Sequence, residues 1–305
     1  MTELDVNIKT PIQKPFLKWI GGKGQILDKI ISLIPKKMEN YHELFLGGGS
    51  VLLSILSLQK YGKIEINKEI YAYDYNRHLI KLYNDIKNNK DEFFRYLSRY
   101  VSKYRNLKGT IINRNPQTEE ESLTSKESYY YWLRKQYNEM DENSIEHSSL
   151  FLFLNKTCFR GMYRESSNGF NVPYGHYKTT PTFITREHLD EISDLIQNVH
   201  FIHSDFRDSI KKIKKGDFVY LDPPYVPENS ISFVSYVADG FTAEMHEILF
   251  SEIKKMNGIK FMLSNSKVDI VLESFSDYNC EDIEARRKIN PKNPAATTRE
   301  VIIYN

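Results

Sequence analysis

The chain has 305 residues with a net charge of +2, of which 27% are charged and 40% apolar, an ordinary globular composition large enough for one domain or two modest ones. No apolar run approaches the roughly 18 residues that cross a bilayer, and the polar start lacks a signal-peptide centre, so we expect no membrane contact. Only Cys158 and Cys280 are cysteines, which excludes a disulfide framework and a zinc set, and predicts a cytoplasmic protein without a metal.

The first strong element along the chain is a strand whose end, at residues 43–46, opens into a glycine-rich turn at residues 47–49. A helix pattern follows at residues 51–56, so backbone N–H groups and an open turn are available to a ligand. A second strand ends at Asp74, where an acid is placed to bind ribose hydroxyls. The glycine spacing is neither a dinucleotide fingerprint nor a phosphate loop, so the pattern favours an adenosine-bearing ligand without a required pyrophosphate.

Residues 85–185 read as mostly helical, with core-facing segments at 129–134 and 150–154 and polar connections at 110–126 and 140–149. Between Arg77 and Arg114, basic residues outnumber acidic ones and alternate with aromatic ones. This stretch is open to two interpretations, a phosphate-facing surface or a solvated helix pair with an aromatic core face.

Strands and helices alternate again after residue 198, with strands predicted at residues 199–204, 218–221 and 260–264 and a helix at 243–256. This alternation predicts an α/β fold with a parallel sheet. The last two strands, 279–285 and 300–304, have no helical pattern between them, so we expect them to form an antiparallel hairpin.

The most informative motif is Asp222-Pro223-Pro224-Tyr225, which follows the apolar strand at residues 218–221. Two prolines end the strand abruptly, at the edge where open α/β sheets bind ligands. Asp222 and the Pro223 carbonyl can each accept an N–H, and Tyr225 can stack on a ring, which suits a nucleobase with an exocyclic amine. An ordinary Asp-Pro turn is the alternative.

Four blocks, at residues 16–23, 45–50, 155–177 and 222–225, occur in the order typical of one enzyme family. The chain resembles the Dam-type (alpha-group, D12 class) DNA adenine-N6 methyltransferases. The resemblance implies a Rossmann-like class I methyltransferase sheet with a terminal antiparallel hairpin. It also implies an S-adenosylmethionine-binding catalytic domain at 1–84 and 186–305, and an inserted, mostly helical target-recognition domain at 85–185.

The same resemblance assigns the binding of S-adenosylmethionine to residues of both halves of the catalytic domain. These residues are Trp19, Lys23, Phe45, Gly47, Gly49, Ser50, Asp74, Asp205, Phe206 and Asp222. Within this set, Asp74 is expected to bind the ribose, Asp205 to accept from the adenine amine and Phe206 to pack on the adenine. Two alternatives remain open, since Trp19 can be a core residue and Asp205 can cap a helix.

Double-stranded DNA is the implied partner, and the resemblance places its contacts in the third block together with one N-terminal lysine. The residues are Lys18, Phe159, Arg160, Met162, Arg164, Asn171, Pro173 and Tyr177. Arg164 matches the family's guanine-contacting arginine, and phosphate contact is the alternative for both arginines. Relatives specific for GATC commonly carry Asn at the position of Arg160, so GATC and a CATG-like site both stay open.

The expected reaction is methyl transfer to adenine N6 in a short palindromic site after the base is flipped out of the duplex. A restriction endonuclease acting on the same site is a candidate partner. Two alternative functions would use the same acceptors for an exocyclic amine. One is an RNA adenine-N6 methyltransferase, and the other is a cytosine-N4 methyltransferase, a class that more often carries Ser before Pro-Pro-Tyr. A non-catalytic DNA-binding relative is an alternative of another class, and a nicotinamide oxidoreductase has only the glycines in its favour.

Overall fold

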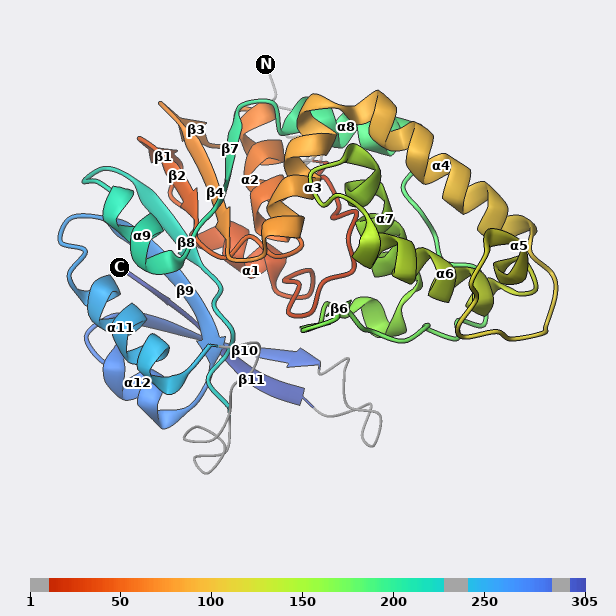
Figure 1. The fold of residues 1–305 in the computed structure, drawn as a ribbon. Helices are drawn as coiled ribbons and strands as arrows, with labels where there is room; N and C mark the ends of the chain where they lie inside the picture. Colours follow the sequence, from red (N-terminus) through yellow and green to blue (C-terminus); the bar gives the residue numbers. More distant parts are fainter. Residues whose placement is uncertain (1–10, 228–240, 287–296) are drawn as a thin grey trace, which may run out of the picture.

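The computed structural model describes residues 11–227, 241–286 and 297–305, and it contains a central sheet of seven strands (Figure 1). From one edge to the other, the strands are β7 (Val199–His203), β4 (Ile70–Asp74), β2 (Tyr41–Glu43), β8 (Phe218–Leu221), β9 (Lys260–Ser266), β11 (Thr297–Tyr304) and β10 (Asn279–Arg286). The pairs from β7 to β9 are parallel, whereas β11 is antiparallel to both β9 and β10. The predicted parallel sheet and the terminal antiparallel hairpin are therefore confirmed.

Both faces of the sheet are buried, and the side chains of its central strands alternate between two hydrophobic clusters. Tyr220 and Met262 belong to the cluster on one face, while Val219 and Leu221 belong to the cluster on the other. The first face is covered by α1 (Leu27–Leu33), α2 (Ser50–Lys60) and α3 (Arg77–Asn88), and the second by α9 (Phe206–Ser209), α11 (Ala243–Lys254) and α12 (Asp269–Ser274) (Figure 1). Two-sided burial explains why these strands read as continuous apolar runs.

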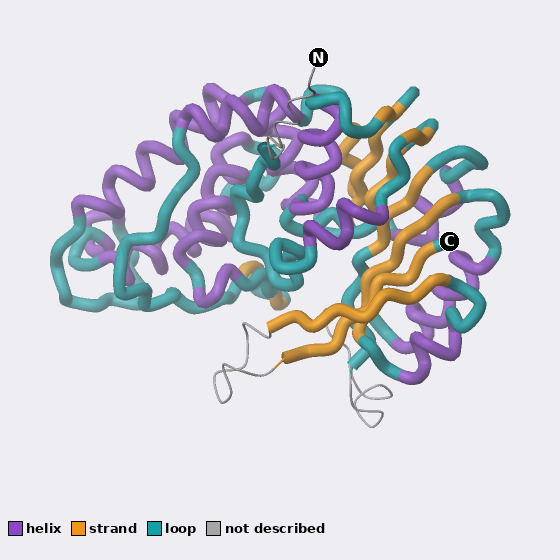
Figure 2. Tube along the Cα trace, turned by 180° about the vertical axis from the view of Figure 1, so that it is seen from behind, coloured by secondary structure: helices purple, strands orange, loops and turns teal. Residues whose placement is uncertain are grey.

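A mostly helical part lies to one side of the sheet, as both views show (Figures 1 and 2). Its elements are α4 (Lys90–Asn106), α5 (Glu119–Ser122), α6 (Lys126–Glu139), α7 (Ile145–Thr157), the short turn η1 (Phe159–Gly161), and the strands β5 (Glu165–Ser166) and β6 (Gly169–Phe170). The first hydrophobic cluster runs without a break from the sheet into these helices. The stretch 110–126, predicted as a loop, contains the short helix α5, which begins because the Thr118 side chain accepts from the Glu121 N–H.

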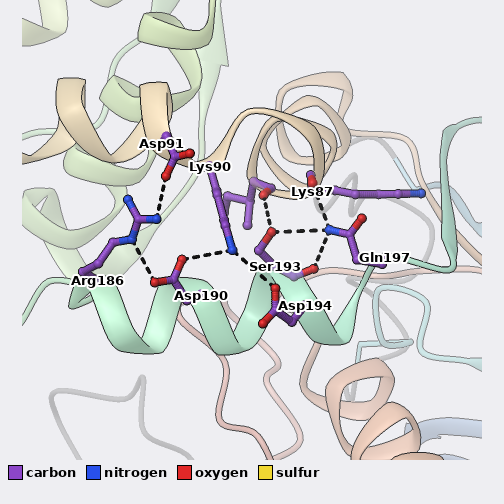
Figure 3. Close-up of polar contacts among 9 residues, drawn as sticks. Lys87, Lys90, Asp91, Arg186, Asp190, Ser193, Asp194 and Gln197 are labelled. Atoms are coloured by element: carbon purple, nitrogen blue, oxygen red, sulfur yellow. Dashed lines mark hydrogen bonds and ion pairs between the residues drawn. The ribbon is translucent and has the colours of Figure 1, made fainter.

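Helix α8 (Arg186–Leu195) is fastened to the α3–α4 junction by a polar network (Figure 3). Lys90 lies 3.1 Å from Asp190 and 3.3 Å from Asp194, and Arg186 bonds to both Asp91 and Asp190. A surface hollow of about 380 Å³ lies at this junction, partly lined by Lys90 and Asp91. Because Lys90 and Arg186 are already bound to carboxylates, the network fixes α8 in place and leaves neither charge for a ligand.

Much of the basic stretch between Arg77 and Arg114 is paired in the same way. Ion pairs join Arg77 to Glu142, Lys81 to Asp85, Arg99 to Glu146, Lys103 to Glu119, and Arg114 to Glu127. These pairs agree better with the solvated helix pair than with a surface reserved for phosphates.

The strand order positions the site. From β2 the chain moves outward through β4 to β7, and it then returns to β8 on the other side of β2. The direction of winding therefore changes between β2 and β8, and a crevice opens outside the carboxyl ends of two such strands. These ends carry Glu43 and Asp222. Among the described residues, no helix is long and apolar enough to cross a membrane.

Candidate active site

Asp222 lies at the carboxyl end of β8, and its two carboxylate oxygens have different surroundings. Oδ2 lies 2.7 Å from Nζ of Lys23, a lysine that is only 5% exposed and also donates to the Gly21 carbonyl over 2.6 Å. Oδ1 is buried and has no hydrogen-bond partner among the described residues. Burial raises the pKa of Asp222 to about 6, against the pull of Lys23 toward a lower pKa. One oxygen is thus fixed by a cation, and the other is an acceptor to which no described residue donates.

The chain after Asp222 is held by the neighbouring strand β9. Asn265 accepts the Val226 N–H over 3.1 Å, and the Ser266 hydroxyl donates to the Val226 carbonyl over 2.5 Å. Tyr225 donates its hydroxyl to Glu300 of β11 over 2.9 Å, and Lys23 lies 4.8 Å from the centre of the Tyr225 ring. These bonds hold the backbone of the Asp-Pro-Pro-Tyr segment in one conformation.

The glycine-rich turn packs against aromatic side chains, which explains its composition. A Cβ on Gly48 would lie 2.9 Å from Cβ of Trp19, and one on Gly49 would lie 2.3 Å from the Tyr83 hydroxyl oxygen. Gly47 and Gly49 also have positive φ angles of 50° and 69°. The glycines therefore allow the turn to approach protein side chains, where the sequence had suggested the approach of a ligand.

Asp74, at the end of β4, accepts two backbone N–H groups, from Gly47 over 2.9 Å and from Asn76 over 2.8 Å. The first bond ties the glycine turn to the end of the second strand. Burial raises the pKa of Asp74, and the two N–H groups oppose that shift. The carboxylate is thus placed at the same edge of the sheet as Asp222, as the sequence predicted.

Glu43, at the end of β2, is a third acid beside Asp74 and Asp222 at this edge of the sheet. The sequence reasoning gave it no role. It is 2% exposed and accepts the Tyr41 hydroxyl over 2.7 Å. Burial, reinforced by the charges of Asp222 and Asp74, raises the pKa of Glu43 to about 8. Glu43 is therefore mostly protonated at neutral pH, so it adds no third negative charge beside Asp74 and Asp222.

Three aromatic side chains near this edge of the sheet pack against one another. Phe45 and Phe206 have ring centres 5.9 Å apart, and Phe241 lies 5.9 Å from the first and 5.5 Å from the second. Asp205 caps α9 through the Arg207 N–H and forms two further bonds of 2.8 Å to the Arg207 guanidinium. The helix-cap alternative for Asp205 is thus observed, and Phe206 is buried with its ring against that of Phe45.

The N-terminal block is clamped to the end of α7. Asn155 accepts the Lys18 N–H over 2.9 Å and donates to the Lys18 carbonyl over 2.7 Å. The Lys18 ammonium lies 4.1 Å from the ring centre of Tyr177, whose hydroxyl donates to the Cys158 carbonyl. A Cβ on Gly161 would come within 2.5 Å of the Lys18 side chain. Lys18 and Tyr177, both predicted to contact DNA, are thereby brought together.

The predicted DNA-contacting residues of the η1 turn lie close together. Phe159 is 41% exposed, and the Arg160 guanidinium lies 5.1 Å from its ring centre. Arg160 has a φ of 58°, an uncommon conformation for a residue other than glycine. Met162 packs on the first hydrophobic cluster, and Pro173 accepts the Phe159 N–H over 2.8 Å.

Arg164 and Asn171 face each other across the base of the β5–β6 hairpin. Nε of Arg164 donates to the Asn171 side-chain oxygen over 2.6 Å, and the Asn171 N–H donates to the Arg164 carbonyl over 3.1 Å. Both residues were predicted to contact DNA, and the structure joins them to each other.

Sequence reasoning missed four residues of this region, Glu43, Phe241, Asn265 and Glu300. The run Ser264-Asn265-Ser266, which ends a buried strand beside the Asp222 strand, was a usable signal for one of them. Glu300 and Phe241 lie far from residue 222 in the sequence and have no local motif, so only the fold brings them to the site.

Comparison with known proteins agrees with this geometry. Residues 19–289 match the model of the D12 class N6 adenine-specific DNA methyltransferases. The chain belongs to this family. It is 35% identical over 291 residues to the type II methyltransferase M.MjaIII of Methanocaldococcus jannaschii, which covers 92% of this chain and 93% of the relative.

Two further relatives match over similar lengths. The type II methyltransferase M1.LlaDCHI of Lactococcus lactis is 33% identical over 302 residues, covering 96% of this chain and 95% of the relative. The DNA adenine methylase of Haemophilus influenzae is 29% identical over 298 residues, covering 95% and 93%.

The protein is therefore an adenine-specific DNA methyltransferase, and the resemblance stated from the sequence is confirmed. Membership implies DNA as substrate and S-adenosylmethionine as the general methyl donor of such enzymes. No group of three or more potential metal ligands occurs in the part of the chain that the structure describes.

Proposed function

We propose that this D12 class enzyme methylates N6 of an adenine flipped out of a short palindromic duplex site, GATC or CATG-like, with S-adenosylmethionine as donor. The observation that carries this proposal is the unequal environment of the Asp222 carboxylate. Oδ2 is held by Lys23, while the buried Oδ1 lacks a donor among the described residues. A buried acceptor without a donor is costly, so this position favours an N–H group of a ligand.

The amine of adenine supplies such a group. Its lone pair is delocalised into the ring, so the nitrogen is a poor nucleophile. Asp222 and the Pro223 carbonyl accept its two N–H groups and favour a lone pair directed away from the ring plane. Catalysis then consists of positioning and electrostatics.

The cysteine of the recognition block, Cys158, is not a nucleophile in this chemistry. Cys158 is fully buried, and burial raises the pKa of its thiol to about 12, which keeps it in the unreactive protonated form.

The proposed cofactor residues fit S-adenosylmethionine in their chemistry. The Asp74 carboxylate is fixed by two backbone N–H groups and retains lone pairs for ribose hydroxyls. Phe45, Phe206 and Phe241 offer aromatic surface for the adenine, and Trp19, Lys23, Gly47, Gly49 and Ser50 lie on the methionine side. When bound, the donor supplies an electrophilic methyl group. Asp205, whose carboxylate forms an ion pair with Arg207, orients the end of the site that is proposed to hold the adenine.

Base flipping is proposed because the target nitrogen is inside the duplex. Tyr225, held by Glu300 and close to Lys23, offers a ring on which the extruded base stacks, and such stacking contributes about 1–3 kcal/mol. Phe159 is exposed on the η1 turn and is suited to enter the space that the base leaves.

We assign sequence readout to Arg164, Arg160, Met162 and Lys18, and we assign residues 85–185 to target recognition. Arg164 is the residue proposed to read a guanine, since a bidentate arginine contact discriminates a base pair by about 1–3 kcal/mol. Two relatives are named type II methyltransferases. A restriction endonuclease that cuts the same site is accordingly a proposed partner.

The direct test uses the purified protein, methyl-tritiated S-adenosylmethionine and duplex DNA. We expect label in N6-methyladenine within one short palindrome, and single-molecule sequencing of DNA from cells that express the protein should report the same motif. Label in N4-methylcytosine, label in RNA alone, or methylation without a fixed motif would each contradict the proposal.

A further inference from the structure

One face of α6 holds the backbone of residues 170–172, which includes the end of β6 and Asn171 directly after it. Three of its side chains, spaced four residues apart, face the same segment. Tyr130 donates to the Val172 carbonyl over 2.7 Å, and Arg134 donates to the same oxygen over 3.1 Å. Asn138, one turn further along, contacts Phe170. The backbone on both sides of Asn171 is therefore fixed by one helix.

Asn138 forms the most complete of these contacts. Its side-chain oxygen accepts the Phe170 N–H over 2.9 Å, and its side-chain nitrogen donates to the Phe170 carbonyl over 3.0 Å. The amide thus pairs with both backbone groups of one residue, as a neighbouring strand would. A Cβ on Gly169 would lie 2.6 Å from this amide, so glycine is required for the close approach. The β5–β6 hairpin is too short to fix its own position.

The contact continues to the proposed readout residue. Asn171 follows Phe170 directly, accepts Nε of Arg164 over 2.6 Å, and accepts Nη2 through its backbone carbonyl over 3.4 Å. A guanidinium held in this way has fewer orientations, so less conformational entropy is lost when it meets a base edge.

We infer that Asn138 is a positioning residue for sequence discrimination, because it fixes Phe170 and Asn171 and thereby orients the Arg164 guanidinium. This inference rests on the proposed readout of a guanine by Arg164. Asn138 itself touches neither the base nor the methyl donor, and it acts through the hairpin. Since it lies on the surface of α6, its loss should change the discrimination between DNA sites more than the stability of the fold.

The experiment compares Asn138→Ala and Asn138→Asp with the parent enzyme. Asn138→Asp has nearly the same shape and keeps the acceptor, but it replaces the donor with an oxygen that repels the Phe170 carbonyl. Glu139→Ala, at an exposed neighbouring position, is the matched control. For each variant, kcat/KM is measured on the site found by sequencing and on duplexes with one substituted base pair, and thermal melting reports folding.

We expect both Asn138 variants to lower discrimination at one base pair by about fivefold to tenfold, with kcat on the preferred site and the melting temperature little changed. Glu139→Ala should behave as the parent. Combining Asn138→Ala with Arg164→Ala should add no further loss, because the two residues act in series.

Two outcomes separate the inference from its premise. If Arg164→Ala abolishes discrimination at that base pair but both Asn138 variants keep it, the positioning role is wrong while the readout by Arg164 stands. If Arg164→Ala itself keeps discrimination, the proposed readout fails. A loss in the Asn138 variants that is uniform across all DNA sites would also overturn the inference, since it would indicate a general effect on the fold.

Discussion

At the scale of the residue, the site depends on a carboxylate whose charge is controlled from two sides. Burial raises the pKa of Asp222 to about 6, and Lys23, with its Nζ 2.7 Å away, moves it in the opposite direction. Below that pH, the carboxyl binds a proton and becomes a weaker acceptor for the amine. The methyl transfer rate should therefore decline as the pH falls through about 6.

This leads to a prediction for Lys23→Met. Without the ammonium, burial is no longer opposed, so the pKa of Asp222 rises and the acid limb of the rate profile should move to higher pH. The measurement is single-turnover methyl transfer at saturating cofactor between pH 5 and 9. Lys29→Met, which removes an exposed lysine paired with Glu281, is the control. A profile for Lys23→Met that stays in place or moves to lower pH would refute the role given to the ion pair.

Local sequence revealed the acids of this site more readily than the groups around them. Asp74 and Asp222 each end an apolar strand, so their common edge followed from the fold class. The Asp205 carboxylate, in contrast, caps α9 and also bonds to the Arg207 guanidinium. The sequence left the helix cap as one of two alternatives for this residue. The Asn138 contact to Phe170 joins residues 32 positions apart without any motif.

At the scale of the element, β2 ends in a buried carboxyl that should affect stability. The pKa of Glu43 is about 8 in the folded protein against about 4.3 in an unfolded chain. Between these values the folded state binds the proton and the unfolded state does not, so the free energy of unfolding should fall as pH rises. The expected slope is up to about 1.4 kcal/mol per pH unit.

Glu43→Gln tests this directly. The glutamine keeps an acceptor for the Tyr41 hydroxyl but cannot ionise. We predict that the variant gains stability relative to the parent as pH rises from 5 to 8, as measured by urea unfolding at each pH. A constant difference between the two proteins across that range would show that Glu43 does not titrate on unfolding.

Most elements of the sheet and its helices were predictable because their apolar patterns are local. The strands at 218–221 and 260–264, the helix at 243–256 and the final antiparallel pair were all expected close to where they are found. The position of β11 between β9 and β10 was not, since it depends on pairing between segments far apart in the chain. The two-residue strands of the β5–β6 hairpin are likewise fixed by contacts with α6.

At the scale of the whole molecule, the N-terminal block joins the sheet to the helical part. Trp19 packs on the glycine turn, and its ring lies 6.2 Å from that of Tyr163 and 6.4 Å from that of Phe151. Next to it, Lys18 is clamped by Asn155. This short segment thus contacts both the proposed cofactor side and the proposed DNA side. Its contacts fix the position of one side relative to the other.

We propose that Asp222 acts on the amine in the chemical step and contributes little to the binding of DNA. The most direct test of this claim is Asp222→Ala in single-turnover methyl transfer, with DNA and cofactor affinities measured on the same preparation and melting as the control for folding. We predict a rate lower by about 10²–10³-fold with DNA affinity retained, whereas Asp74→Ala should weaken cofactor binding instead. Near-normal turnover in Asp222→Ala, or a loss explained entirely by weaker DNA binding, would contradict it.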